Sequence, residues 1–150
     1  MNAITDNGLA PLNIPSAQTI LQALLAVVPA HCVLSRQEDT RPYECDGLSL
    51  YRCVPIAVVL PETEAQVQAV LKTCKKLNVP VVARGAGTGL SGGAMPHAQG
   101  VLLGMAKFNK IKSIDREAAL AVVEPGVRNL AVSEAVSQFG LYYAPDPSSQ

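Results

Sequence analysis

The sequence predicts an α+β fold, and three features of the chain support this prediction. The aliphatic segment Ile56–Leu60 is followed by a segment with helical periodicity and by a second aliphatic segment, which is the pattern of a β-α-β unit. Five of the 11 glycines then lie between residues 84 and 93, in a loop that leads to a further aliphatic segment. Hydrophobic residues make up 49% of the chain and charged residues 16%, which excludes an intrinsically disordered protein.

The charge balance and the cysteine pattern exclude several classes of function. The 12 Lys and Arg side chains equal the 12 Asp and Glu side chains, so no net charge favours nucleic acid or an anionic membrane. No apolar stretch is long enough to span a membrane and no signal peptide precedes Arg36, so we expect a cytoplasmic protein. The four cysteines lack zinc-site spacing, so we expect buried free thiols and no metal site.

The N-terminal part is expected to contain one helix and one short strand. Residues 1–15 lack periodicity and are expected to form a flexible lead. Ser16 can cap a helix that runs to about Val28. Its inward face would comprise Ile20, Leu21, Leu24, Leu25 and Val28. Cys32–Leu34 is a candidate strand, and residues 35–54 are polar and irregular.

The β-α-β unit occupies residues 56–83. The segment Thr63–Gln66 matches a capping box, which predicts the start of a helix. The apolar stripe of this helix would comprise Val67, Val70, Leu71, Cys74 and Leu77. The next strand is predicted at Val79–Ala83, and the length of the connection favours a parallel pair with a right-handed crossover.

Three more strands and one helix are expected after the glycine-rich segment. The strands are predicted at Val101–Gly104, Ile111–Ile114 and Leu120–Val123. Residues 115–117 would form the turn between the last two strands. The final helix would begin at Arg128 or Asn129 and end before Gly140 as its C-cap, with an inward face of Val132, Ala135, Val136 and Phe139.

The glycine loop, Arg84–Gly93, carries the strongest chemical signal. Glycines permit positive φ angles and let successive backbone N–H groups point into one concavity, which is typical of a phosphate site. Thr88 and Ser91 add hydroxyl donors, and Arg84 adds a positive charge.

Two common phosphate-binding folds do not fit this loop. Gly87–Gly92 matches the pattern GxGxxG, but the short segment Ala94–Gly100 leaves no room for the helix of a Rossmann fold. The Gly-Lys-Ser/Thr sequence of a P-loop is absent. The pattern instead predicts a phosphate cradle of loop amides between two strands.

Four stretches together resemble FAD-linked oxidases of the vanillyl-alcohol-oxidase type. They are Pro42–Gly47, Pro80–Gly93, Pro125–Leu130 and Leu141–Gln150. The glycine loop is specific for the family. The other three are similar to the flavoprotein subunits that oxidise small 2-hydroxy acids, and the resemblance runs from about residue 16 to residue 150.

The resemblance implies a fold and a set of cofactor contacts. FAD would lie between two small α/β subdomains, residues 16–84 and 85–150, of which the second is expected to be incomplete. The residues expected to bind FAD are Arg84, Gly85, Ala86, Gly87, Thr88, Gly89, Leu90, Ser91, Gly92, Gly93, Pro145, Asp146 and Ser148. The glycine loop contains no His for a covalent tether, so the FAD is expected to be non-covalent.

The resemblance also implies an activity. The substrate would be a small 2-hydroxy acid, with glycolate the first choice and D-lactate and D-2-hydroxyglutarate as alternatives. It would pass a hydride equivalent to the flavin, and the electrons would leave through an iron–sulfur partner subunit, which could also associate the protein with a membrane. The family's catalytic groups would follow Gln150, so we expect a fragment or a truncated product. The alternative is a non-catalytic module that binds a phosphate-bearing ligand or a partner.

Several single residues keep two interpretations. His97 is either a phosphate contact or an exposed loop residue, and Tyr142 and Tyr143 either line the flavin site or pack in the core. The segment Tyr43–Asp46 carries two acids, Glu44 and Asp46, which serve either as a general base or in a helix cap or turn. Asp146, between two prolines, either faces a ligand or sits in a rigid surface turn.

Overall fold

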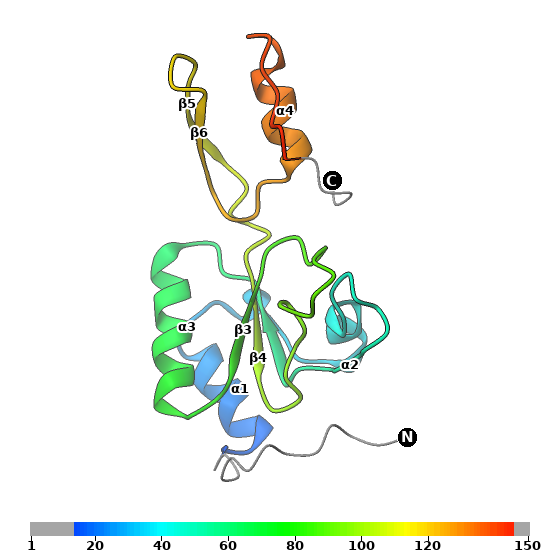
Figure 1. The fold of residues 1–150 in the computed structure, drawn as a ribbon. Helices are drawn as coiled ribbons and strands as arrows, with labels where there is room; N and C mark the ends of the chain where they lie inside the picture. Colours follow the sequence, from blue (N-terminus) through cyan, green and yellow to red (C-terminus); the bar gives the residue numbers. More distant parts are fainter. Residues whose placement is uncertain (1–13, 146–150) are drawn as a thin grey trace.

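The computed structural model describes residues 14–145 as a four-stranded sheet with helices and a separate hairpin with one helix (Figure 1). The α-helices are α1 (Ala17–Leu25), α2 (Gln37–Thr40), α3 (Glu64–Lys76) and α4 (Asn129–Ser137). The strands are β1 (Val33–Leu34), β2 (Ala57–Val59), β3 (Val81–Arg84), β4 (Val101–Gly104), β5 (Ile111–Asp115) and β6 (Leu120–Val123). The mixed α+β fold is confirmed. Most of the expected flexible lead lies outside the described residues.

The four-stranded sheet has the order β1-β2-β4-β3. The strand β4 is parallel to both β2 and β3, whereas β1 is antiparallel to β2. The prediction that β2 and β3 form a direct pair is therefore wrong, because β4 lies between them. Every residue of β4 is buried while β3 is only partly buried, so the more apolar strand occupies the centre.

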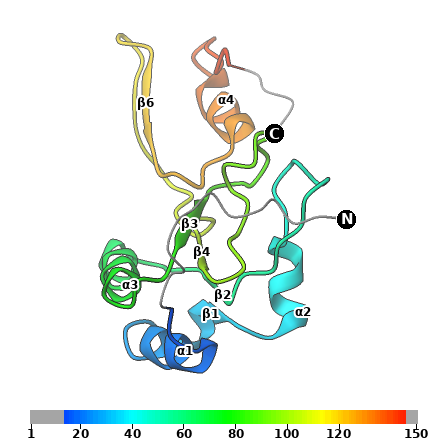
Figure 2. The same ribbon diagram turned by 60° about the horizontal axis from the view of Figure 1, so that its bottom comes forward.

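The core lies between this sheet and two helices. Helix α1 packs beside α3, and α2 lies on the opposite side of the sheet from α3 (Figure 2). The side chains of Ser16 and Thr63 cap α1 and α3, as predicted, and accept hydrogen bonds from Thr19 N and Gln66 N. The fully buried residues of α1 and α3 are Ile20, Leu24, Val70 and Cys74.

Two leucines expected in the core are exposed. Leu25 is 48% exposed and Leu71 is 44% exposed. Each follows a buried residue directly, and successive residues of a helix point about 100° apart. The apolar stripe that contacts the sheet is therefore narrower than the one predicted.

The segment predicted to be irregular contains a short helix. Helix α2 and the 3₁₀ turn Arg41–Tyr43 occupy its first half. Arg36 Nε donates to Asp39 Oδ2 over 2.8 Å, and the buried Thr40 hydroxyl donates to Arg36 O. A four-residue helix is too short to show a period of 3.6 residues, which explains why the pattern was missed.

The hairpin β5–β6 and α4 form the second part of the molecule. Asp115 Oδ1 accepts hydrogen bonds from the N–H groups of Glu117 and Ala118, which closes the predicted turn. Val136 of α4 is buried. The helix ends at Ser137 with Gln138 as its C-cap, so the prediction of Gly140 as the C-cap is wrong; Gly140 lies two residues further on, with a φ of +71°. Phe139, predicted to face inward, is 38% exposed, and the Arg116 guanidinium lies 5.0 Å from its ring centre.

The position of β4 does not match the expected boundary between the two subdomains at residues 84 and 85. This strand falls within residues 85–150, yet it forms the centre of the first sheet. The division into two subdomains remains a prediction. Within residues 14–145, no helix combines the length and apolarity needed to cross a membrane.

The four free cysteines differ in burial, and this difference predicts their reactivity. Cys32 and Cys74 are buried, whereas Cys45 and Cys53 are only partly buried. Loss of solvation raises the pKa of Cys74 to about 11, so its reactive thiolate is scarce at about pH 8. In the folded protein, a colorimetric thiol reagent is expected to modify Cys45 and Cys53 and to reach the other two only after denaturation. Rapid modification of all four thiols would contradict this burial pattern.

Candidate functional site

The glycine loop, Arg84–Gly93, begins at the carboxyl end of β3. Because β2, β3 and β4 are parallel, their carboxyl ends share one edge of the sheet, where ligands bind in many open α/β sheets. The chain passes from β3 through turns to β4 without a helix, which confirms the predicted strand–loop–strand arrangement. Gly87 and Gly92 adopt φ angles of +73° and +76°, which favour glycine.

The middle of the glycine loop is open on its outer side. A Cβ atom added to Gly89 or Gly93 would meet no atom within 4 Å. Thr88, Leu90 and Ser91 are exposed. The loop therefore offers backbone amides and hydroxyl groups to a ligand without obstruction by its own side chains.

A cleft of about 520 Å³ lies beside the first half of the glycine loop. The facing wall is formed by the β4–β5 connection, the turn at residues 125–128 and the start of α4; its lining residues include Ala106, Asn109, Gly126, Val127, Arg128 and Ala131. Within this wall, the turn packs closely against the β4–β5 connection. Only a glycine at position 126 permits this packing, since a Cβ there would lie 2.8 Å from Phe108 O. The cleft thus lies between the two parts of the molecule.

Arg84 is oriented differently from the sequence expectation. Its Nη1 donates to Cys45 O over 2.7 Å and to Tyr43 O over 3.4 Å. The guanidinium carbon lies 5.6 Å from the centre of the Tyr43 ring. The side chain therefore fastens the start of the glycine loop to the segment around residue 45.

Asp46 connects that segment to the other end of the glycine loop. The carboxylate is 5% exposed; Oδ1 accepts from Leu48 N over 3.0 Å, and Oδ2 accepts from Ala94 N over 3.3 Å. These bonds support the turn interpretation of Asp46. The Asp-Gly pair at residues 46–47 is a turn signal in the sequence, but its contact with the loop was not predicted.

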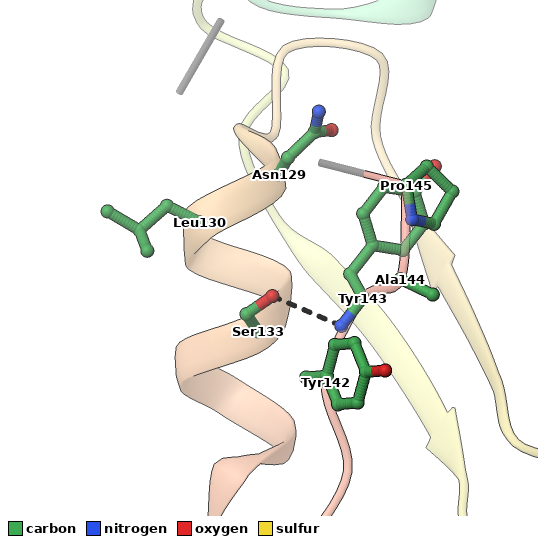
Figure 3. Close-up of a pocket in the computed structure, with 7 residues that line it drawn as sticks. All are labelled: Asn129, Leu130, Ser133, Tyr142, Tyr143, Ala144 and Pro145. Carbon is green, nitrogen blue, oxygen red and sulfur yellow. Dashed lines mark hydrogen bonds between the residues drawn. The ribbon is translucent and has the colours of Figure 1, made fainter. Parts of the chain in front are cut away.

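A second pocket, of about 230 Å³, lies between α4 and residues 142–145 (Figure 3). Tyr143 N donates to Ser133 Oγ over 3.1 Å and holds this segment against the helix. Tyr142 and Tyr143 are 77% and 42% exposed, so the core-packing interpretation is wrong. Pro145 lines the same pocket, whereas Asp146 and Ser148 lie outside the described residues.

The histidines lie in polar surface networks. His97 is exposed and its Nδ1 accepts from Gln99 N, as in an exposed loop turn. His31 Nε2 lies 3.2 Å from Glu62 Oε1, and Lys107 Nζ donates to the same oxygen over 2.6 Å. Hydrogen bonds from Lys107 and His31 lower the pKa of Glu62. Cys32 lies beside His31 and Glu62, and the three side chains could in principle ligate a metal ion. The carboxylate of Glu62, however, already forms an ion pair with Lys107.

Comparisons with known proteins agree with this geometry. The family described as "FAD binding domain" matches residues 55–150. The chain is 57% identical to the glycolate oxidase subunit GlcD of Escherichia coli strain K12 over 132 residues, which are 88% of this chain and 26% of that protein. It is 32% identical to the mitochondrial D-lactate dehydrogenase (cytochrome) of Arabidopsis thaliana over 94 residues, which are 63% of this chain and 17% of that protein.

A solved structure of p-cresol methylhydroxylase is also similar. It superposes with a TM-score of 0.69 and 25% sequence identity, over 86% of this chain and 26% of that chain. The chain thus spans about a quarter of the length of the glycolate oxidase subunit and of this structure. The family match covers more than half of the chain and includes the glycine loop and the cleft. The chain therefore belongs to the FAD-binding domain family of flavoproteins of the vanillyl-alcohol-oxidase type.

Proposed function

We propose that the glycine loop, Arg84–Gly93, holds the pyrophosphate of FAD. The observation that carries this proposal is the open outer side of the loop, where Gly89 and Gly93 leave room for phosphate oxygens to approach the backbone. The segment containing Pro145, Asp146 and Ser148 would approach the same cofactor. The loop contains no His or Cys for a covalent tether, which supports non-covalent binding.

The two parts of the molecule would hold the cofactor between them. The cleft supports this arrangement because its walls come from the glycine loop on one side and from the turn before α4 on the other. The four-stranded sheet and the hairpin with α4 would thus belong to two subdomains, with the division near the β4–β5 connection. This placement keeps β4 with the sheet in which it pairs.

We propose that the protein is a flavin-dependent oxidoreductase of small 2-hydroxy acids, with glycolate as the first candidate. The similarity to the glycolate oxidase subunit supports this choice, and the weaker similarity to a D-lactate dehydrogenase supports the alternative substrate. The flavin would accept two electrons from the substrate as the hydroxyl group becomes a ketone or aldehyde. The described residues would bind and orient the FAD pyrophosphate.

The electrons would then pass to a partner, for which we propose an iron–sulfur subunit. The matched relative is itself named as a subunit, and the four cysteines of this chain lack the spacing of a cluster-binding site. Such a partner would allow a cytoplasmic protein to associate with a membrane.

A substrate assay tests the proposed activity. The longest natural reading frame that contains this chain should be expressed with its neighbouring genes and supplied with an artificial electron acceptor. We expect turnover of glycolate that exceeds turnover of D-lactate and D-2-hydroxyglutarate. A preference for D-lactate would replace the substrate assignment, and a flavin-free protein without turnover would favour the non-catalytic module.

Replacing Arg84 with alanine is expected to weaken FAD binding less than changes in the loop glycines. The amide groups of the loop remain, and the substitution removes only the guanidinium hydrogen bonds to Cys45 O and Tyr43 O; a hydrogen bond to a charged group contributes roughly 1.5–3 kcal/mol. Fluorescence titration with FAD measures the effect. Arg116→Ala is the matched control, because Arg116 also lies over an aromatic ring but on the distant hairpin. Equal effects of the two substitutions would contradict a role for Arg84 at the site.

A further inference from the structure

We propose that the segment Tyr43–Leu48 is a brace that sets the conformation of the glycine loop before FAD binds, with the buried Asp46 carboxylate as its main positioning residue. This inference rests on the proposed role of the loop as the FAD pyrophosphate site. It assigns a function to a segment that contains neither a predicted FAD contact nor a lining residue of the cleft.

The brace contacts the glycine loop at its start, middle and end. At the start, Arg84 Nη1 donates to Cys45 O over 2.7 Å. In the middle, a Cβ on Gly47 would lie 2.6 Å from Thr88 O, so the two backbones touch. At the end, Ala94 N donates to Asp46 Oδ2 over 3.3 Å. One short segment therefore contacts the glycine loop at its start and in its middle, together with Ala94, the residue that directly follows it.

The chemistry of Asp46 suits a positioning role. It is 5% exposed, and among the described residues its carboxylate enters no ion pair. Its two oxygens are instead used by the N–H groups of Leu48 and Ala94. A buried carboxylate is costly unless it is hydrogen-bonded, so these two bonds must form together when the loop is in place. Asp46 thereby couples the turn of the brace to the end of the loop.

This coupling matters because five glycines make the loop intrinsically flexible. A flexible loop must lose its conformational freedom when it binds a ligand, whereas a braced loop has lost that freedom during folding. The brace also engages the Arg84 guanidinium through the carbonyl oxygens of Tyr43 and Cys45, so the loop amides are the groups left to meet the phosphates. We therefore expect the brace to tighten FAD binding without touching FAD.

The test compares Asp46→Asn with Asp115→Asn. Asparagine offers one acceptor oxygen and one NH₂ group, so one of the two Asp46 bonds must be lost. Asp115 also accepts two backbone N–H bonds in a turn, but it lies at the tip of the hairpin. Both variants are made in the longest natural reading frame that contains this chain. Hydrogen exchange of the apo protein and the FAD dissociation constant are then measured for each.

We expect Asp46→Asn to accelerate hydrogen exchange in peptides covering residues 84–95 and to leave exchange in peptides of β2 unchanged. We also expect it to raise the FAD dissociation constant by about tenfold or more. Asp115→Asn should change neither quantity. Wild-type exchange or wild-type FAD affinity in Asp46→Asn would overturn the brace. If Asp46→Asn does not fold, Gly47→Ala decides, because its Cβ displaces Thr88 O while Asp46 remains; unchanged loop exchange in that variant overturns the proposal.

A separate measurement distinguishes this inference from the proposed function. In the wild-type protein, FAD should slow exchange in the peptides covering residues 84–95. If FAD binds but does not protect these peptides, the loop is not the pyrophosphate site and the proposed function fails. The apo comparison of Asp46→Asn with Asp115→Asn still shows whether the brace orders the loop.

Discussion

In the longest natural reading frame that contains this chain, replacing Gly87 with valine is expected to abolish flavin retention. Gly87 has a φ of +73°, where a β-branched residue is strained by roughly 1–2 kcal/mol. A Cβ at this position would also overlap the Arg84 guanidinium and push it away from Cys45 O. The substitution therefore distorts the loop and disrupts the brace at once. The ratio of flavin to protein after gel filtration measures the result.

Ser137→Ala is the control for this experiment. Ser137 is exposed on α4, and its hydroxyl donates to Glu134 O within its own helix. Its removal should leave the flavin ratio unchanged. Full flavin occupancy in Gly87→Val would show that the positive φ and the contact with Arg84 are not needed for binding.

Local signals in the sequence predicted most of the elements. The capping residues Ser16 and Thr63 marked the starts of two helices because an N-cap hydrogen bond involves only the next few residues. The glycine loop was placed between two strands because the short segment before β4 cannot hold a helix. These features depend on neighbours in the chain, which a single sequence displays directly.

The features that the sequence did not reveal depend on distant contacts. The insertion of β4 between β2 and β3 follows from competition among strands for the buried centre of the sheet, which no local pattern records. The hydrogen bonds of Arg84 with Cys45 and of Asp46 with Ala94 join residues 39 and 48 positions apart. The direction of the Arg84 side chain is set by a segment that appeared irregular in the sequence.

The wall of the cleft that faces the glycine loop also depends on contacts that the sequence does not reveal. The stretch at residues 125–130 was recognised through family resemblance, not through any chemistry of its residues. The structure gives Gly126 a physical role, since its missing side chain lets the turn approach Phe108 O and Met105 O. Asn109 of the β4–β5 connection and Arg128, the N-cap of α4, also line the cleft.

The central claim is that the amides of the glycine loop hold the FAD pyrophosphate, and Gly89→Val tests it most directly. Unlike Gly87, Gly89 has no positive φ, and a Cβ there would meet no atom of the protein within 4 Å. The valine side chain would therefore occupy only the space proposed for phosphate oxygens. The fold should remain intact, so any loss of flavin reports on the ligand.

The measurement is the flavin-to-protein ratio of Gly89→Val after gel filtration, with its thermal unfolding midpoint in the apo form as a check on folding. The account predicts wild-type stability of the apo protein and almost complete loss of flavin, with Ser137→Ala retaining full occupancy. A folded Gly89→Val protein that keeps its full complement of FAD would contradict the account, because the cofactor would then not approach this loop.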